Sequence, residues 1–204
     1  MLRILPLLAF CALATPVFAE EPVILVLGDS LSAGHGIEVN NSWVQLLQQR
    51  LDRLGYRYHV VNASISGDTT RGGLTRTGQA LAQHHPRVFI VQLGGNDGLR
   101  GLALDDMRRN LANIIELGRK SGAMVLLVGV RLPPNYGEVY VKKFHSVYRE
   151  IARSYEVPLV PYLLQGIGGH DELMQVDRLH PNSAAQAHML DNVWPHLLPL
   201  LGQK

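Results

Sequence analysis

The chain has 204 residues, with 19 lysines and arginines against 17 aspartates and glutamates, and a net charge of only +2 at pH 7. This balance, without a basic stripe, argues against nucleic acid as a partner. The length is typical of one domain with a sizeable hydrophobic core.

The first residues predict an export signal that is not part of the fold. Arg3 supplies a positive charge, residues 4–14 form an apolar run, and Val17-Phe18-Ala19 is typical of a cleavage site. The run is shorter than the ~18 apolar residues that span a bilayer. We therefore expect a removed signal peptide at 1–19 and a single domain at 20–204. The protein is expected in the periplasm or the medium, without a stable membrane anchor.

The remaining chain alternates between strand-like and helical stretches. Continuous apolar runs predict buried strands at 23–27, 58–61, 88–93, 124–130 and 157–160. Amphipathic patterns predict helices at 42–54, 72–84, 105–121, 138–155 and 182–193. Asp105 or Asp106 is expected to cap the third helix, and Pro195 to kink or restart the last one. Together they predict a flavodoxin-like, three-layer α/β/α domain around a five-stranded parallel sheet.

Polar segments follow four of these strands. They are Gly28-Asp29-Ser30-Leu31, Asn62 to Thr69, Gly94-Gly95-Asn96-Asp97-Gly98 and, beyond the fifth strand, Asp177-Arg178-Leu179-His180. The carboxyl ends of parallel strands lie at one edge of a sheet, where open α/β folds build their ligand sites. We therefore expect the four segments to meet at one cleft.

The residue types in these segments suit acyl transfer. Ser30 alone is also explained as a helix N-cap, but a serine becomes a nucleophile when an imidazole such as that of His180 accepts its proton. Asp177, three residues upstream of His180, is placed to orient that imidazole.

Stabilising the tetrahedral intermediate also needs hydrogen-bond donors. The backbone N–H groups of Ser30 and Gly67 and the side-chain amide of Asn96 are the candidates. Asp97 is expected to shape a turn through bonds to its own backbone, and Asp29 to steady the loop that presents Ser30. None of the other histidines has a partner at metal-ligand spacing, so we expect neither a metal nor a cofactor.

Apolar residues in two loops are candidates for an acyl-binding wall. They are Leu99, Leu102, Leu132, Pro133, Pro134 and Tyr136. The alternative is that these side chains only pack the loops against each other.

The four segments resemble, in order, the four conserved blocks of the GDSL (SGNH) hydrolase superfamily. The similarity extends over the whole mature chain, and Arg131-Leu132-Pro133-x-Asn135-Tyr136-Gly137 is similar to a segment of the bacterial multifunctional thioesterases of this family. The resemblance implies Ser30 as nucleophile, His180 as base, Asp177 as its partner, and Gly67 and Asn96 as oxyanion donors. It also implies esterase, arylesterase, thioesterase and lysophospholipase activities on small-molecule acyl substrates, in a protein that we expect to be a monomer.

Two other functions remain as alternatives. A carbohydrate O-deacetylase of the same superfamily would prefer acetyl groups to long acyl chains. A non-catalytic nucleotide- or flavin-binding module would need a phosphate-binding glycine motif, and none follows the first strand. The G-x-S-x-G motif is absent as well, which disfavours the α/β-hydrolase elbow.

Overall fold

The structure is a computed structural model that describes residues 21–202, so the predicted signal peptide at 1–19 lies outside the described residues. Five strands form one sheet: β1 (Val23–Gly28), β2 (His59–Asn62), β3 (Val88–Gln92), β4 (Met124–Val128) and β5 (Leu159–Val160). All neighbours pair in parallel, in the order β2-β1-β3-β4-β5. The predicted five-stranded parallel sheet is confirmed.

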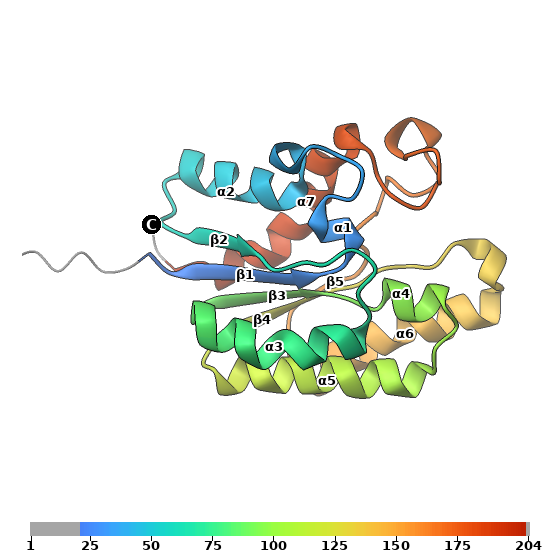
Figure 1. Cartoon of the computed structure of the whole chain (residues 1–204), viewed down its shortest axis with the longest axis horizontal. Helices are drawn as coiled ribbons and strands as arrows, with labels where there is room; N and C mark the ends of the chain where they lie inside the picture. Colours follow the sequence, from blue (N-terminus) through green and yellow to red (C-terminus); the bar gives the residue numbers. More distant parts are fainter. Residues whose placement is uncertain (1–20, 203–204) are drawn as a thin grey trace, which may run out of the picture.

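Helices cover both faces of this sheet, which Figure 1 shows almost edge-on. The helices are α1 (Ser30–Ala33), α2 (Trp43–Leu54), α3 (Thr70–His84), α4 (Gly95–Leu99), α5 (Leu104–Lys120), α6 (Glu138–Ser154) and α7 (Gln186–Leu197). Helices α2 and α7 lie on one face, and α3, α5 and α6 on the other (Figure 1). The three-layer α/β/α arrangement follows from these positions.

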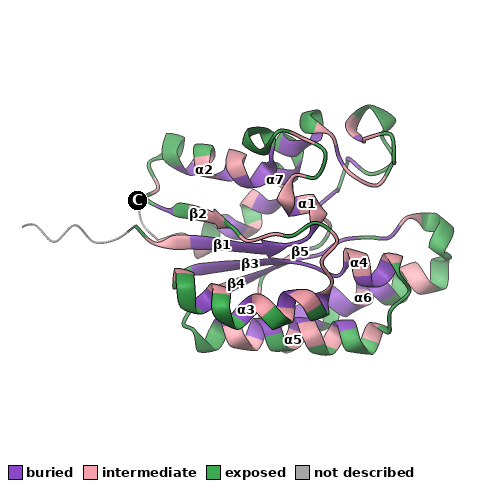
Figure 2. Cartoon of the chain, viewed as in Figure 1, coloured by how far each residue is buried: buried purple, intermediate pink, exposed green. Residues whose placement is uncertain are grey.

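The two faces of the sheet bury separate hydrophobic clusters because side chains alternate along a strand. Ile24 and Val26 of β1 pack with Trp43 in the cluster under α2 and α7. Leu25 and Leu27 belong to the cluster under the opposite helices. All four β1 side chains are fully buried, as the continuous buried core of the sheet in Figure 2 illustrates. Burial on both faces explains the unbroken apolar run in the sequence.

The order of the strands in the sheet determines where a ligand site is expected. From β1 the chain crosses to β2 on one side and then returns to β3 on the other, so the order reverses between β1 and β3. Crevices at such reversals, beyond the carboxyl ends of the strands, are where this fold class binds ligands. The segments after β1 and β3, which contain Ser30 and Asn96, therefore flank this crevice.

Several helix boundaries differ from the sequence prediction. The N-cap of α5 is Ala103 and not Asp105 or Asp106. Both aspartates lie in the first turn of the helix, where their negative charges interact favourably with the helix dipole. The last helix starts at Gln186 because residues Ser183–Ala185 form a separate 3₁₀ turn capped by Asn182. It then continues through Pro195 to Leu197 without restarting there. Within residues 21–202, no helix is both long and apolar enough to cross a membrane.

Candidate active site

Ser30 lies at the first position of a one-turn helix directly after β1. The Asp29 side chain caps this helix, with its Oδ1 accepting from the Leu31 N–H at 3.1 Å. At Gly28, a Cβ atom would lie 2.8 Å from Ser32 Oγ and 2.9 Å from Gln92 Oε1. Only glycine leaves room for this tight strand-to-helix turn, which presents Ser30 at the crevice.

His180 connects Ser30 to Asp177. Its Nε2 lies 2.9 Å from Ser30 Oγ, and its Nδ1 lies 2.7 Å from Asp177 Oδ2. The two contacts lie on opposite sides of the imidazole, so the ring can accept a proton from the hydroxyl while donating to the carboxylate. Ser30 and His180 are separated by 150 positions in the chain.

The loop around His180 is held by its own hydrogen bonds. Asp177 Oδ1 accepts from the backbone N–H groups of Leu179 and His180, both at 2.9 Å. The Gln175 N–H donates to the His180 carbonyl at 2.7 Å. Arg178, between Asp177 and His180, takes a left-handed conformation with φ of 55°, which folds Asp177 back onto His180.

Asp177 is a strong hydrogen-bond acceptor in this loop. Its partial burial raises the pKa of the carboxyl group. This effect is outweighed by hydrogen bonds from the His180 backbone and ring and from the Leu179 N–H, and by the charge of His180, which bring the pKa to about 2. Asp177 is therefore a carboxylate at any neutral pH.

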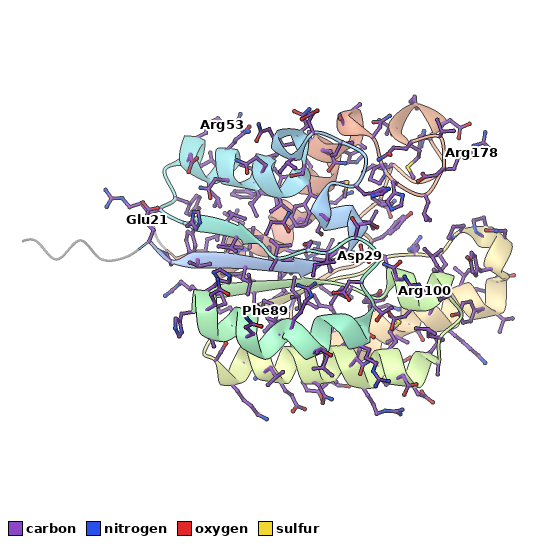
Figure 3. The ribbon with its side chains drawn as sticks, in the orientation of Figure 1. Glu21, Asp29, Arg53, Phe89, Arg100 and Arg178 are labelled. Atoms are coloured by element: carbon purple, nitrogen blue, oxygen red, sulfur yellow. The ribbon has the colours of Figure 1, made fainter. Side chains whose placement is uncertain are left out.

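The candidate oxyanion donors lie beside Ser30. Gly67 and Asn96 line one cleft of about 260 Å³ together with Ser30 and His180. Asn96 Nδ2 donates to the Asp68 carbonyl at 2.9 Å, which fixes the direction of the amide. Gly67 has a φ of +81°, a backbone conformation that glycine adopts without strain. Its carbonyl accepts from Arg100, which Figure 3 shows at the same edge of the sheet as Asp29.

Buried polar side chains join the segment of Ser30 to β3. Asp29 is 1% exposed, and its Oδ1 also accepts from Gln92 Nε2 at 3.1 Å. Burial raises the pKa of Asp29 to about 6, although the hydrogen bonds from Leu31 and Gln92 act in the opposite direction. Gln92 Oε1 accepts from Ser32 Oγ at 2.6 Å, so the strand β3 and the helix α1 are joined.

The cleft wall contains three of the six residues predicted to form an acyl groove. Leu99, Leu132 and Pro133 line the cleft, whereas Leu102, Pro134 and Tyr136 do not. Leu102 lines a separate pocket beside α3, and the Tyr136 hydroxyl donates to the Leu99 carbonyl at 3.1 Å, which is a loop-packing contact. The sequence reasoning gave no role in the cleft to several other lining residues, among them Leu31, His35, Val130, Leu164 and Leu179, which come from four different segments.

The turn role expected for Asp97 is wrong. Its buried carboxylate accepts from the backbone N–H of Thr70 at 2.8 Å and from the Thr70 hydroxyl at 2.5 Å. These hydrogen bonds join the start of α3 to α4. Thr70 is 27 positions from Asp97 in the chain, so no local sequence pattern indicates the pairing. Among the described residues, no group of three or more histidine, aspartate, glutamate or cysteine side chains is arranged to hold a metal ion.

A family model and known proteins match most of this chain. The model of the GDSL-like Lipase/Acylhydrolase family matches residues 26–188. Esterase TesA of Pseudomonas aeruginosa is 50% identical over 183 residues, which are 90% of this chain and 91% of that protein. Thioesterase 1/protease 1/lysophospholipase L1 of Escherichia coli K12 is 40% identical over 192 residues, 94% and 91% of the two chains.

A solved structure extends this similarity to three dimensions. The crystal structure of TesA superposes with a TM-score of 0.87 and 50% identity, and it covers 88% of this chain and 99% of its own. The matched family model spans β1 to α7 and so includes every segment that lines the cleft. The chain belongs to the GDSL-like lipase/acylhydrolase family.

Proposed function

We propose that this protein is a serine esterase that hydrolyses carboxylic esters and acyl thioesters through an acyl-enzyme on Ser30. The proposal rests on the two contacts of the His180 ring, 2.9 Å to Ser30 Oγ and 2.7 Å to Asp177 Oδ2. A helix-capping serine needs neither contact. The family membership supports ester hydrolysis independently of this geometry.

The first half-reaction transfers the acyl group to the enzyme. Ser30 Oγ attacks the carbonyl carbon, and its proton moves to His180 Nε2. The carboxylate of Asp177 stabilises the imidazolium that forms. The carbonyl oxygen becomes an oxyanion that the N–H groups of Ser30 and Gly67 and the Asn96 amide bind. When the C–O or C–S bond breaks, the imidazolium gives its proton to the departing alcohol or thiol.

The second half-reaction releases the acid. Water replaces the leaving group, loses its proton to His180 Nε2 and adds its oxygen to the acyl carbon. The same donors bind the second oxyanion. The bond to Ser30 Oγ then breaks, and Oγ recovers the proton from the imidazolium. Each well-placed oxyanion donor lowers the barrier by roughly 3–4 kcal/mol.

The lining of the cleft supports acyl groups of medium to long chain as substrates. Leu99 and Leu132 line the cleft from the segments after β3 and β4, and Leu31, Val130 and Leu164 extend the apolar surface. An acetyl-specific site gains nothing from such a surface, so the O-deacetylase alternative is less favoured. Esters, thioesters and lysophospholipids are therefore the proposed small-molecule substrates.

We also propose that residues 1–19 direct export and are removed, and that residues 20–204 act as a single-domain monomer in the periplasm. The sequence pattern described above supports the cleavage site after Ala19. Amino-terminal sequencing of the protein recovered from a periplasmic fraction should begin at Glu20. A chain that still begins at Met1 would contradict the export proposal.

A fluorophosphonate probe tests the mechanism directly, because it reacts with activated serines. The mature protein should gain the mass of one adduct, and peptide mapping should place the adduct on Ser30. Ser66 also lines the cleft but contacts neither His180 nor Asp177 in any hydrogen bond among the described residues, so the Ser66→Ala variant should label normally. An adduct on another serine, or no adduct, would contradict the proposal.

A further inference from the structure

Arg76 joins the ends of two strands of the sheet. Its side chain extends from α3, which packs against β1 (Figure 1). Nε donates to Asp68 Oδ2 at 2.8 Å, Nη2 donates to the Gly28 carbonyl at 3.2 Å, and Nη1 donates to the Ala63 carbonyl. Gly28 ends β1, two positions before Ser30, whereas the other two acceptors follow β2. One guanidinium group therefore connects the turn of the proposed nucleophile to the segment after β2.

Asp68 extends this connection to two of the proposed oxyanion donors. It directly follows Gly67 in the chain. Its backbone carbonyl accepts from Asn96 Nδ2 at 2.9 Å, so it also orients the amide of the segment after β3. The third proposed donor, the Ser30 N–H, belongs to the turn whose carbonyl Arg76 binds. A displacement of the guanidinium group would therefore disturb all three donors.

The ion pair between Arg76 and Asp68 is shielded from water. The two side chains are 20% and 12% exposed. A Cβ atom at Gly72 of α3 would overlap Asp68 Oδ1, so glycine at this position lets the carboxylate lie against the helix. Charge-assisted hydrogen bonds are strong, and a planar guanidinium group fixes their directions. The pair is therefore suited to hold the segment after β2 in one position.

We propose that Arg76 is a positioning residue that holds the oxyanion donors in place through Gly28, Ala63 and Asp68. The inference rests on the proposed esterase function and deepens it, because Arg76 does not line the cleft and would touch neither the substrate nor the reacting atoms. The substrate oxygen becomes an oxyanion only in the tetrahedral intermediate and in the transition states on either side of it. Displaced donors therefore slow the reaction without weakening the binding of the substrate in its ground state.

Arg76→Ala tests the proposal against a matched control. With p-nitrophenyl octanoate we expect kcat per active site to fall at least about tenfold, while KM changes less than about threefold. Complete labelling with a fluorophosphonate counts the folded active sites, so that a loss of folded protein does not lower the measured kcat. Arg50→Ala is the control, because Arg50 is also 20% exposed and pairs with Asp191 at 2.6 Å, but neither residue lines the cleft. This control should lose stability and keep its kcat.

An inhibitor that imitates the tetrahedral intermediate separates positioning from general damage to the fold. Octyl trifluoromethyl ketone is attacked by Ser30 Oγ, and its carbonyl oxygen then becomes an oxyanion that the donors bind. The inhibition constant of this ketone should rise in Arg76→Ala by about the factor by which kcat/KM falls. In Arg50→Ala it should equal that of the wild type.

Two glycines of α3 provide a second pair of variants, in which the arginine is kept. Gly72→Ala adds a methyl group where Asp68 Oδ1 lies, which should displace the carboxylate and lower kcat at least about threefold. At Gly78 an added Cβ would meet nothing within 4 Å, so Gly78→Ala should keep the wild-type kcat. This pair decides the question if Arg76→Ala does not fold.

Three results would overturn the proposal. They are a loss of kcat below about tenfold in folded Arg76→Ala, an unchanged inhibition constant for the ketone in that variant, and equal kcat values in the two glycine variants. If the wild type neither hydrolysed p-nitrophenyl octanoate nor reacted with the fluorophosphonate, the esterase function would fail instead.

Discussion

The ring of His35 lies against the ring of His180, with 4.5 Å between their centroids and 44° between their planes. His35 follows the one-turn helix that carries Ser30 and lines the same cleft. It belongs neither to the proposed triad of Ser30, His180 and Asp177 nor to the proposed oxyanion donors. The contact restricts movement of the His180 imidazole towards His35.

This contact predicts a positioning role for His35. The variant His35→Ala should lower kcat about two- to tenfold, because a ring contact of this kind contributes ~0.5–1.5 kcal/mol. His35→Phe keeps an aromatic ring and should retain most of the activity. Steady-state kinetics on p-nitrophenyl octanoate measures both variants. Equal losses of kcat in the two variants would show that the ring contact does not position His180 for catalysis.

Asp177→Asn should lower kcat by up to about 10⁴ with little change in KM. The asparagine can still accept from the backbone N–H groups of Leu179 and His180, so the loop should keep its shape. Its amide would face His180 Nδ1 as a donor and force the proton onto Nε2, where it blocks proton transfer from Ser30. Because the pKa of Asp177 is about 2, the wild type should not lose this group's charge above about pH 3. A loss below tenfold would contradict the orienting role.

The raised pKa of Asp29 predicts that its contribution to the free energy of unfolding falls as the pH rises. The lowered pKa of Asp177 has the opposite effect. The pKa of Asp29 rises from 3.8 to about 6 on folding, so the native state holds this proton more tightly than the unfolded state. Between about pH 4 and 6 the free energy of unfolding therefore falls as pH rises, by about 2–3 kcal/mol from this group. In Asp29→Asn, which preserves the acceptor for Leu31, this fall should disappear.

Urea unfolding of the wild type and of Asp29→Asn at pH 4 and pH 7.5 measures the difference. The variant should gain about 2–3 kcal/mol relative to the wild type between the two pH values. A constant difference across this range would mean that Asp29 does not titrate there.

Leu99 and Leu102 form a natural pair for testing the acyl wall. Leu99 lines the cleft, whereas Leu102, three positions later, lies outside it and is 42% exposed. Leu99→Ala should weaken the preference for octanoyl over acetyl esters about fivefold, because part of the apolar contact with the chain is lost. Leu102→Ala should leave the chain-length profile unchanged. Identical profiles for wild type and Leu99→Ala would favour loop packing as the role of this residue.

The fold could be predicted from the sequence because it depends on local patterns. The apolar run of β1 and the amphipathic pattern of α2 are readable over a few residues, and α2 ends at Leu54 as predicted. The meeting of Ser30 with His180 follows from topology, since parallel strands end at one edge. Helix ends were less predictable: at α5 two aspartates offered plausible caps, but the chain enters the helix one residue before Asp105.

The parts of the site that the sequence did not indicate depend on tertiary contacts. The hydrogen bonds between Asp97 and Thr70 join residues that are 27 positions apart in the chain. The ring contact between His35 and His180 joins two loops that are far apart in sequence. Such contacts between distant segments form only once these segments are packed together on the sheet.

The central claim is that Ser30 is the nucleophile, and its removal tests the claim most directly. Ser30→Ala and the control Ser66→Ala should both keep the circular dichroism spectrum and unfolding midpoint of the wild type. With p-nitrophenyl octanoate, we expect Ser30→Ala to lose at least about 10³-fold in kcat, while Ser66→Ala stays within about threefold. A correctly folded Ser30→Ala variant that keeps more than about one-tenth of the wild-type kcat would contradict the account.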